Sequence, residues 1–263
     1  MAPDTVIHDA LVLTVDSENR LFENGTVILD EGRIAAVRPS QEGDRDIAAD
    51  RVIDGDGKLV MPGLVNAHTH LELTPLIGAS SDLDLQEMMA SMTNLVGKLG
   101  RGDLRYLAEA GYELAALNFL AGGITTSNSM DVDPRIGADV FGEAGLRGFF
   151  GPMMSDLFWN RPVDEQFERA RAFIEEYHDS YDGRIRATIN PHDDWSCTRD
   201  LWERTADLAA EYPDVLVHTH LLELEESNTM ARSNGGEDSL DLLDDVGLLN
   251  DRLVAAHFRL ADD

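Results

Sequence analysis

The chain has 263 residues, with 50 Asp plus Glu against 21 Lys plus Arg, a formal net charge of -29 and 43% hydrophobic residues. This length accommodates one large domain, or a large domain with a small appendage, and the composition is that of a globular chain. A surface this acidic repels phosphate backbones, which excludes nucleic acid as a partner. The start, MAPDTVIHDA, lacks a signal-peptide pattern, and no apolar stretch approaches the roughly 20 residues that span a bilayer, so we expect no membrane partner.

The acidic residues are spread along the whole chain, and aspartate is more frequent among them than glutamate. There are 31 Asp against 19 Glu, and the two lysines are Lys58 and Lys98. We interpret this pattern as a halophilic surface, which stays solvated in concentrated salt and whose self-repulsion destabilises the fold in low salt. The single cysteine, Cys197, excludes an intramolecular disulfide and favours a cytoplasmic location; we expect it to be a buried side chain rather than a nucleophile.

The first sixty residues predict a separate β subdomain. Short alternating runs are separated by turn signals such as Asp30-Glu31-Gly32 and the segment 54–57. The runs cover 5–15, 25–30, 33–37 and 51–54. We expect residues 1–60 to form a small antiparallel β-sandwich.

From Lys58 onward, short apolar runs alternate with amphipathic stretches, which is typical of βα units around a parallel sheet. The predicted strands are 59–67, 123–129, 146–154, 185–189, 215–219 and 253–257. The predicted helices are 83–99, 104–120, 163–177, 198–211 and 240–249. A closed (β/α)₈ barrel needs eight strands, so these residues predict either a truncated barrel or an open sheet.

The strongest chemical signal is PGLVNAHTH, which places His68 and His70 at the end of an apolar strand. Alternate residues of a strand point to one face, so these two imidazoles converge on one ion at the C-terminal mouth of a barrel. Neutral imidazoles suit zinc or iron.

A second signal is VHTHLLE, at residues 217–223. If His220 lies at the strand end, it can add a third nitrogen ligand, and Glu223 in the following loop can transfer protons without binding the metal. His218 lies deeper in the strand, and we interpret it as a packing or hydrogen-bonding residue rather than a ligand. His192 and His257 also follow predicted strands, whereas His8 and His178 do not, and we expect these two at the surface.

These motifs, in this order, resemble the amidohydrolase superfamily. The similarity covers MPGLVNAHTH, NPHDDWSC, VHTHLLE and AAHFRLADD, and it is closest to the mononuclear-metal branch of S-adenosylhomocysteine, guanine and cytosine deaminases and triazine chlorohydrolases. The resemblance implies a TIM-type (β/α)₈ barrel over residues 61–263, here with about six of its eight strands. The HTHLEL variant around Glu72 is more similar to aminodeoxyfutalosine-type deaminases than to the triazine enzymes.

The resemblance also implies the role of each residue. His68, His70 and His220 are the expected metal ligands, for Zn²⁺ with Fe²⁺ as the alternative. Glu223 is the expected catalytic acid and base, His257 orients the water, and His192 contacts the substrate. The implied reaction is attack of a metal-bound hydroxide on a nitrogen heterocycle, with loss of ammonia.

Two departures from the family pattern stand out. The family has a further aspartate ligand after its eighth strand, and no position here matches it; Asp262 and Asp263 are assigned to the start of the next helix. Asp193 and Asp194 stand where the family has other residues, and we expect them to change which polar groups of a substrate are accepted. No lysine is placed for carboxylation, which argues against the binuclear branch.

Two alternatives to the deaminase remain open. One is a dechlorinase of the same branch, with the same metal site and a chloride leaving group. The other is a chain that corresponds to the first two thirds of such an enzyme, which binds metal without turnover or pairs with another chain that supplies the missing strands. Because an incomplete barrel leaves two unpaired strand edges, we expect a homo-oligomer. In either case the expected ligand is a small heterocyclic molecule.

Overall fold

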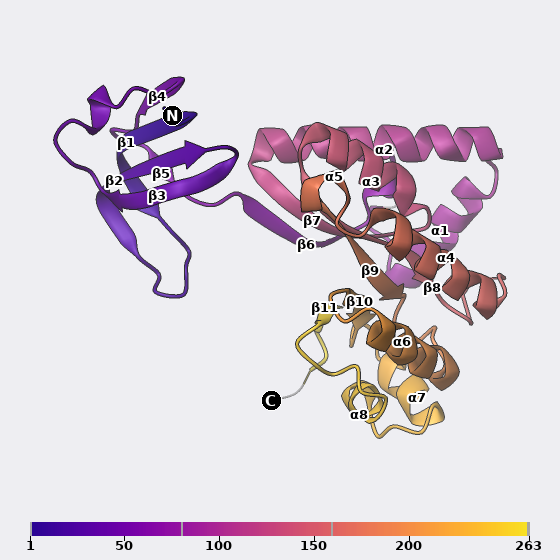
Figure 1. Ribbon diagram of the computed structural model, residues 1–263. Helices are drawn as coiled ribbons and strands as arrows, with labels where there is room; N and C mark the ends of the chain where they lie inside the picture. The colour runs from indigo at the N-terminus through magenta and orange to yellow at the C-terminus, as the bar shows by residue number, and fades with distance from the viewer. Residues whose placement is uncertain (1, 80, 159, 262–263) are drawn as a thin grey trace. The chain divides into compact units, whose positions relative to one another are not determined.

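The computed structural model describes residues 2–79, 81–158 and 160–261 (Figure 1). The chain divides into two compact units, one ending at Gly63 and the other starting at Leu64. The sequence pattern placed the end of the first unit at residue 60. Asp262 and Asp263, assigned above to the start of a further helix, lie outside the described residues.

The first unit is built on one five-stranded sheet. Its strands are β1 (Thr5–Leu13), β2 (Leu21–Asp30), β3 (Arg33–Pro39), β4 (Arg51–Asp54) and β5 (Leu59–Val60). The order is β3-β2-β1-β4, and β5 also pairs with β1. β1, β2 and β3 pair antiparallel, but β4 and β5 run parallel to β1. The described residues therefore form a single mixed sheet, not the antiparallel two-layered sandwich that alternation alone predicted.

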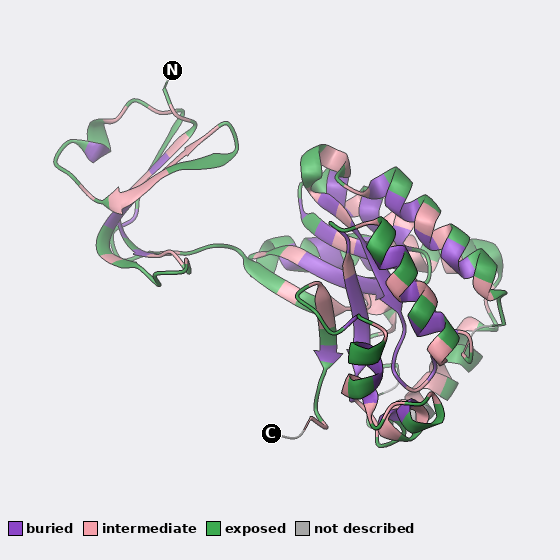
Figure 2. Ribbon diagram, turned by 60° about the horizontal axis from the view of Figure 1, so that its bottom comes forward, coloured by how far each residue is buried: buried purple, intermediate pink, exposed green. Residues whose placement is uncertain are grey.

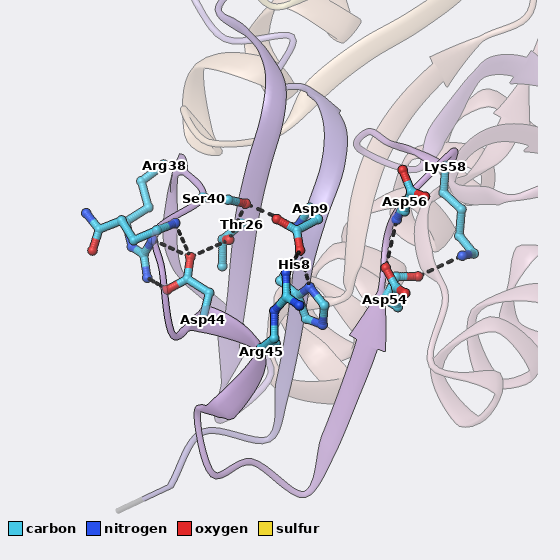
Figure 3. Close-up of polar contacts among 11 residues, drawn as sticks. His8, Asp9, Thr26, Arg38, Ser40, Asp44, Arg45, Asp54, Asp56 and Lys58 are labelled. Atoms are coloured by element: carbon cyan, nitrogen blue, oxygen red, sulfur yellow. Dashed lines mark hydrogen bonds and ion pairs between the residues drawn. The ribbon is translucent and has the colours of Figure 1, made fainter.

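Polar side chains contact one another inside this unit (Figure 3), and Asp44 and His8 among them are buried. Asp44, in the short 3₁₀ helix η1 (Asp44–Asp46), pairs with Arg38 at 2.6 Å and accepts a hydrogen bond from Thr26 at 2.7 Å. The Arg38 guanidinium holds the pKa of Asp44 well below its usual range. His8 is only 7% exposed, and its Nδ1 lies 2.9 Å from Asp9 Oδ2. The expectation that His8 lies at the surface is therefore wrong.

The second unit contains a six-stranded parallel sheet. Its strands are β6 (Leu64–Thr69), β7 (Ile124–Asp131), β8 (Arg147–Met154), β9 (Ile185–Pro191), β10 (Leu216–Leu221) and β11 (Leu253–His257). They pair in sequential order, with β6 and β11 at the two ends. The sheet curls, so that the rings of His68 on the first strand and His257 on the last are 5.4 Å apart between centroids. The prediction of an α/β barrel fold with six strands is confirmed.

Helices connect the strands of the second unit. They are η2 (Leu71–Leu76), α1 (Leu85–Val96), α2 (Arg101–Gly122), α3 (Pro134–Ala144), α4 (Val163–Tyr177), α5 (Ser180–Gly183), α6 (Arg199–Glu211), α7 (Glu226–Ser233) and α8 (Ser239–Asp245). Four of them match predicted helices to within three residues, and α8 matches a fifth but ends four residues earlier, at Asp245. In the described residues, no helix is long and apolar enough to cross a membrane.

The sequence pattern did not predict α3. Its interior glycines, Gly137 and Gly142, lower its helix propensity. Both are required by packing, because a Cβ at either position would lie 2.4 Å from a tyrosine ring atom, of Tyr112 and Tyr181 respectively. Tertiary contacts therefore override the local preference.

One apolar core runs between the strands and the inner faces of the helices (Figure 2). The rings of Phe141 and Phe150 pack edge to face at 5.3 Å, and Trp202 is fully buried. Cys197 is also fully buried, and burial raises the pKa of its thiol well above the usual range. The expectation that Cys197 is a core residue is therefore confirmed.

Candidate active site

The predicted site residues stand at the carboxyl ends of four strands. His68 is the penultimate residue of β6 and His70 directly follows that strand, while His220 is the penultimate residue of β10. His192 directly follows β9, and His257 is the last residue of β11. Because all of these strands are parallel, their carboxyl ends meet at one edge of the sheet.

The imidazoles converge closely. Donor nitrogens of His68, His220 and His257 lie within 4.8 Å of one another. His70 Nε2 is 3.2 Å from His220 Nε2, and the His68 and His70 rings are 5.0 Å apart between centroids. The fold thus gathers the three expected ligands and places His257 beside them.

Hydrogen bonds from outside the cluster orient two of these rings. His70 Nδ1 donates to the main-chain carbonyl of Met130 on β7, which leaves the Nε2 lone pair free. His68 Nδ1 lies 2.9 Å from Nε2 of His218, a fully buried residue of β10. His218 therefore hydrogen-bonds to an expected ligand, which matches the interpretation of it as a supporting residue.

The environment keeps these imidazoles neutral. Burial, followed by the neighbouring imidazoles, lowers the pKa of His68 to about 3. Burial also lowers the pKa of His70 to about 4 and holds that of His220 well below its usual range. Metal ions bind the neutral ring, so the donor set at this edge fits a divalent cation that prefers nitrogen.

Glu223 lies in the loop after β10, with its Oε1 atom 3.6 Å from His257 Nε2. Burial raises the pKa of Glu223 above its usual value. The backbone is left-handed where β10 and β11 end. The φ angle is 52° at Leu222, directly after β10, 71° at His257, the last residue of β11, and 52° at Phe258. Such conformations are unfavourable for non-glycine residues and are commonly found at functional sites.

His192 lies at the side of the cluster. Its ring is 4.9 Å from that of His220 and stacks on Phe158 at 5.5 Å. Its Nδ1 atom contacts the carboxylate of Asp193 and lies 3.3 Å from Ser196 Oγ. These contacts hold one ring nitrogen against the protein and restrict the orientation of the ring.

The Asp194 side chain is bonded to the protein, although we expected from the sequence that it would change which polar groups of a substrate are accepted. Its carboxylate oxygens accept hydrogen bonds from the Leu222 amide at 2.8 Å and from the Ser227 hydroxyl at 2.6 Å. Asp194 is 1% exposed. It therefore contacts the next loop of the protein, rather than a polar group of a substrate.

Sequence reasoning missed a pair of carboxyl groups near His70, a buried one of Asp131 and a half-buried one of Glu72. Asp131, the fully buried last residue of β7, accepts hydrogen bonds from the Ser129 hydroxyl and from the Glu72 amide. The Glu72 carboxylate accepts a hydrogen bond from Val132 N at 2.9 Å. Burial raises the pKa of both carboxyls. A carboxylate two residues after the predicted strand 123–129 was the signal that could have identified Asp131.

A comparison with family models supports the assignment drawn from the motifs. The model described as the amidohydrolase family matches residues 59–260. The chain belongs to the amidohydrolase family. The resemblance read from PGLVNAHTH and VHTHLLE is thereby confirmed, and the fold of this amidohydrolase is the one that the resemblance implied.

Curated relatives of this amidohydrolase are deaminases. It is 35% identical, over 90% of its length, to a 5′-deoxyadenosine deaminase of Methanothermobacter thermautotrophicus, of which it covers 54%. It is 30% identical, over 98% of its length, to a 5-methylthioadenosine/S-adenosylhomocysteine deaminase of Symbiobacterium thermophilum, of which it covers 58%. The chain thus spans somewhat more than half the length of these relatives.

Solved structures give the same fold. An adenosine deaminase of Xanthomonas campestris with bound zinc has a TM-score of 0.85 and 28% identity, with 96% of this chain and 57% of that chain covered. An atrazine chlorohydrolase of Arthrobacter aurescens in complex with zinc has a TM-score of 0.82 at 24% identity, covering 98% of this chain and 61% of that one. The second likeness concerns the fold alone.

Proposed function

We propose that this amidohydrolase is a metal-dependent hydrolytic deaminase that releases ammonia from an adenosine-like nucleoside. The observation that carries the proposal is the convergence of donor nitrogens from His68, His220 and His257 within 4.8 Å, with the Glu223 carboxylate 3.6 Å from His257. The residues of the site belong to the hydrolase unit predicted over residues 61–263.

His68, His70 and His220 would hold the metal ion through neutral imidazole nitrogens. Zinc is the proposed ion, on the strength of the nitrogen donor set and of the zinc in the adenosine deaminase of similar structure. When bound, zinc supplies Lewis acidity that lowers the pKa of water from about 16 to about 7. Iron is the alternative, and elemental analysis of the purified chain distinguishes the two.

Glu223 would move the protons. A carboxyl whose pKa is raised by burial holds a proton closer to neutral pH than an exposed glutamate does. In the proposed reaction Glu223 protonates a ring nitrogen, which makes the adjacent ring carbon a better electrophile for the attacking water. The Glu223 carboxylate then takes the proton of the hydroxyl group added to that carbon and passes it to the amine, which leaves as ammonia. His257 orients the attacking water, and His192 contacts the heterocycle from the side of β9.

The substrate class rests on the relatives. Two of them are named for 5′-deoxyadenosine and for 5-methylthioadenosine with S-adenosylhomocysteine. These compounds share a 6-aminopurine ring on a ribose and differ in the group at the 5′ position. We therefore propose a 6-aminopurine nucleoside with a modified 5′ group.

The test combines metal analysis with ammonia release. The chain is purified in molar salt, loaded with zinc and offered 5′-deoxyadenosine, 5′-methylthioadenosine, S-adenosylhomocysteine and a chlorinated triazine. We expect about one zinc per chain and ammonia from at least one nucleoside. Release of chloride from the triazine, with no ammonia from any nucleoside, would favour the dechlorinase over the deaminase. Bound zinc without turnover of any compound would support the non-catalytic alternative.

The Glu223→Gln variant tests the assigned proton transfer. The amide keeps the size of the side chain but cannot donate and accept a proton in turn, so we expect a loss of at least about 100-fold in kcat. Zinc content should stay at the wild-type level. An unchanged rate would remove Glu223 from the mechanism.

A further inference from the structure

The loop after β9 hydrogen-bonds to the loop that carries Glu223. Asp194 makes both contacts, and its two carboxylate oxygens bind different segments. Oδ2 accepts the amide hydrogen of Leu222, the residue directly before Glu223, at 2.8 Å. Oδ1 accepts the hydroxyl hydrogen of Ser227, in the first turn of α7, at 2.6 Å. Asp194 and Ser227 are both buried, so water does not replace these bonds readily.

Leu222 adopts a backbone conformation that needs such support. Its φ of 52° is left-handed, which the side chain of leucine disfavours. Its amide is held by Asp194, and its carbonyl accepts a hydrogen bond from Leu260 N at 3.1 Å. Because both sides of this residue are bonded, the direction in which the chain leaves Leu222 is set, and with it the starting point of the Glu223 side chain.

The contact of Glu223 with His257 does not fix the carboxylate by itself. A separation of 3.6 Å between Oε1 and Nε2 exceeds the usual length of an N–H···O hydrogen bond. The position of the Glu223 carboxylate therefore depends on the backbone around it, which Asp194 holds on the side of Leu222 and on the side of Ser227.

We propose that Asp194 is a positioning residue for Glu223, joining the loop after β9 to both ends of the segment 222–227. The proposal rests on the proposed function, because it takes Glu223 as the proton-transfer group. A displacement of about 1 Å in a reacting group is sufficient to lower the rate by about 100-fold.

Three variants and one matched control test the proposal. Asp194→Ala removes both bonds, and Ser227→Ala removes one. Asp194→Asn keeps both, since its amide oxygen accepts from Leu222 and its NH₂ donates to the Ser227 hydroxyl. The control is Asp156→Ala, because the Asp156 carboxylate makes the same kind of bonds, to the Thr198 amide at 2.9 Å and to the Thr198 hydroxyl, at the start of α6.

Steady-state kinetics on the zinc-loaded chain provide the first readout. We expect Asp194→Ala to lower kcat by about 10- to 100-fold with KM within about threefold of wild type and the zinc content unchanged. Asp194→Asn should restore kcat to within about threefold, and Ser227→Ala should lie between the two. Asp156→Ala should keep kcat. Loss of zinc, an equal loss in Asp156→Ala, or no rescue by asparagine would overturn the proposal.

Hydrogen exchange at the Leu222 amide provides a readout that needs no turnover. We expect exchange in a peptide spanning residues 218–227 to be at least about tenfold faster in Asp194→Ala and unchanged in Asp156→Ala. If the wild-type chain releases no ammonia, the proposed function fails, and this exchange then decides about Asp194. Faster exchange supports the link to the Glu223 segment, and unchanged exchange rejects it.

Discussion

The histidines at the strand ends depend on the groups that contact their second ring nitrogen. The main-chain carbonyl of Met130 accepts from His70 Nδ1 and leaves Nε2 for a cation. For His68 the corresponding contact is another imidazole, His218 Nε2, at 2.9 Å. When His68 ligates through Nε2, its Nδ1 carries the hydrogen that His218 accepts. Such supporting contacts fix the ring orientation and raise the affinity for metal.

His218→Ala should therefore weaken zinc binding. We expect the affinity to fall by roughly 10- to 100-fold, because His68 loses the contact that orients its ring. Competition with a chromogenic chelator measures the change. His178→Ala is the control, since His178 Nδ1 accepts a hydrogen bond from the Ala187 amide at 3.2 Å, at the start of β9. If His218→Ala and His178→Ala bind zinc with the same affinity, the contact of His218 with His68 does not contribute to metal binding.

At the scale of elements, the connection from β6 into η2 is tied to the end of β7 by carboxyl groups. Asp131 accepts from the Ser129 hydroxyl and the Glu72 amide, and Glu72 accepts from the Val132 amide. The hydroxyl of Ser129 in turn accepts the Leu71 amide at 3.2 Å. The residues of this network flank His70 and Met130 in the chain. The network therefore supports both the expected ligand His70 and the Met130 carbonyl that accepts its Nδ1 hydrogen.

Asp131→Asn should stabilise the fold above mildly acidic pH. The pKa of Asp131 is higher in the folded chain than in the unfolded chain, where it is near 4. The wild-type carboxyl therefore stabilises the fold fully only below about pH 4, and this contribution is lost as the pH rises through the pKa of the folded chain. Asparagine does not titrate and still accepts from the Glu72 amide. We expect a gain of about 1 kcal/mol or more at pH 8 and a smaller gain at pH 5, measured by denaturant unfolding of the metal-free chain in molar salt. A gain that decreases with rising pH would contradict this assignment.

At the scale of the whole molecule, the net charge of -29 dominates. Carboxylates are spread over both units, and most of them cannot pair one to one with a lysine or arginine because acidic residues outnumber basic ones by more than two to one. Their mutual repulsion favours expanded states when salt does not screen it.

Thermal stability should therefore rise with salt. We expect Tm to increase by on the order of 5 °C or more between about 0.1 M and about 2 M KCl, as repulsion is screened and burial is strengthened. Differential scanning fluorimetry measures the shift. An uncharged osmolyte at matched water activity is the control, and a shift as large with the osmolyte would assign the effect to hydration instead of charge.

The two end strands of the sheet give a second prediction for the whole molecule. Within the described residues, β6 and β11 each pair on one side only, and Leu64 and Val65 of β6 are 51% and 66% exposed. Exposed apolar strand edges favour association. We expect light scattering in molar salt to show an oligomer, and Val65→Lys to reduce association. A clean wild-type monomer would count against the prediction.

Local patterns in the sequence were sufficient for the order of the six strands of the second unit, for five of its helices and for the choice of site candidates, which were His68, His70, His220 and Glu223. Apolar runs of strand length define the strands, and parallel strands bring their carboxyl ends to one edge, so polar residues at those positions are informative without knowledge of the pairing. Conversely, the parallel pairing of β4 and β5 with β1 and the burial of His8 could not be read from alternation.

Only the tertiary structure decided which residues far apart in the chain contact each other. The His68–His218 pair joins positions 150 residues apart, and the Leu222–Asp194 bond joins positions 28 apart. Periodicity reports which face of an element is buried, but not which group a buried polar atom meets there. The sequence alone therefore determined the fold class and the set of imidazoles, whereas packing decided which side chains orient them, because hydrogen bonds in the core depend on distances that no local spacing encodes.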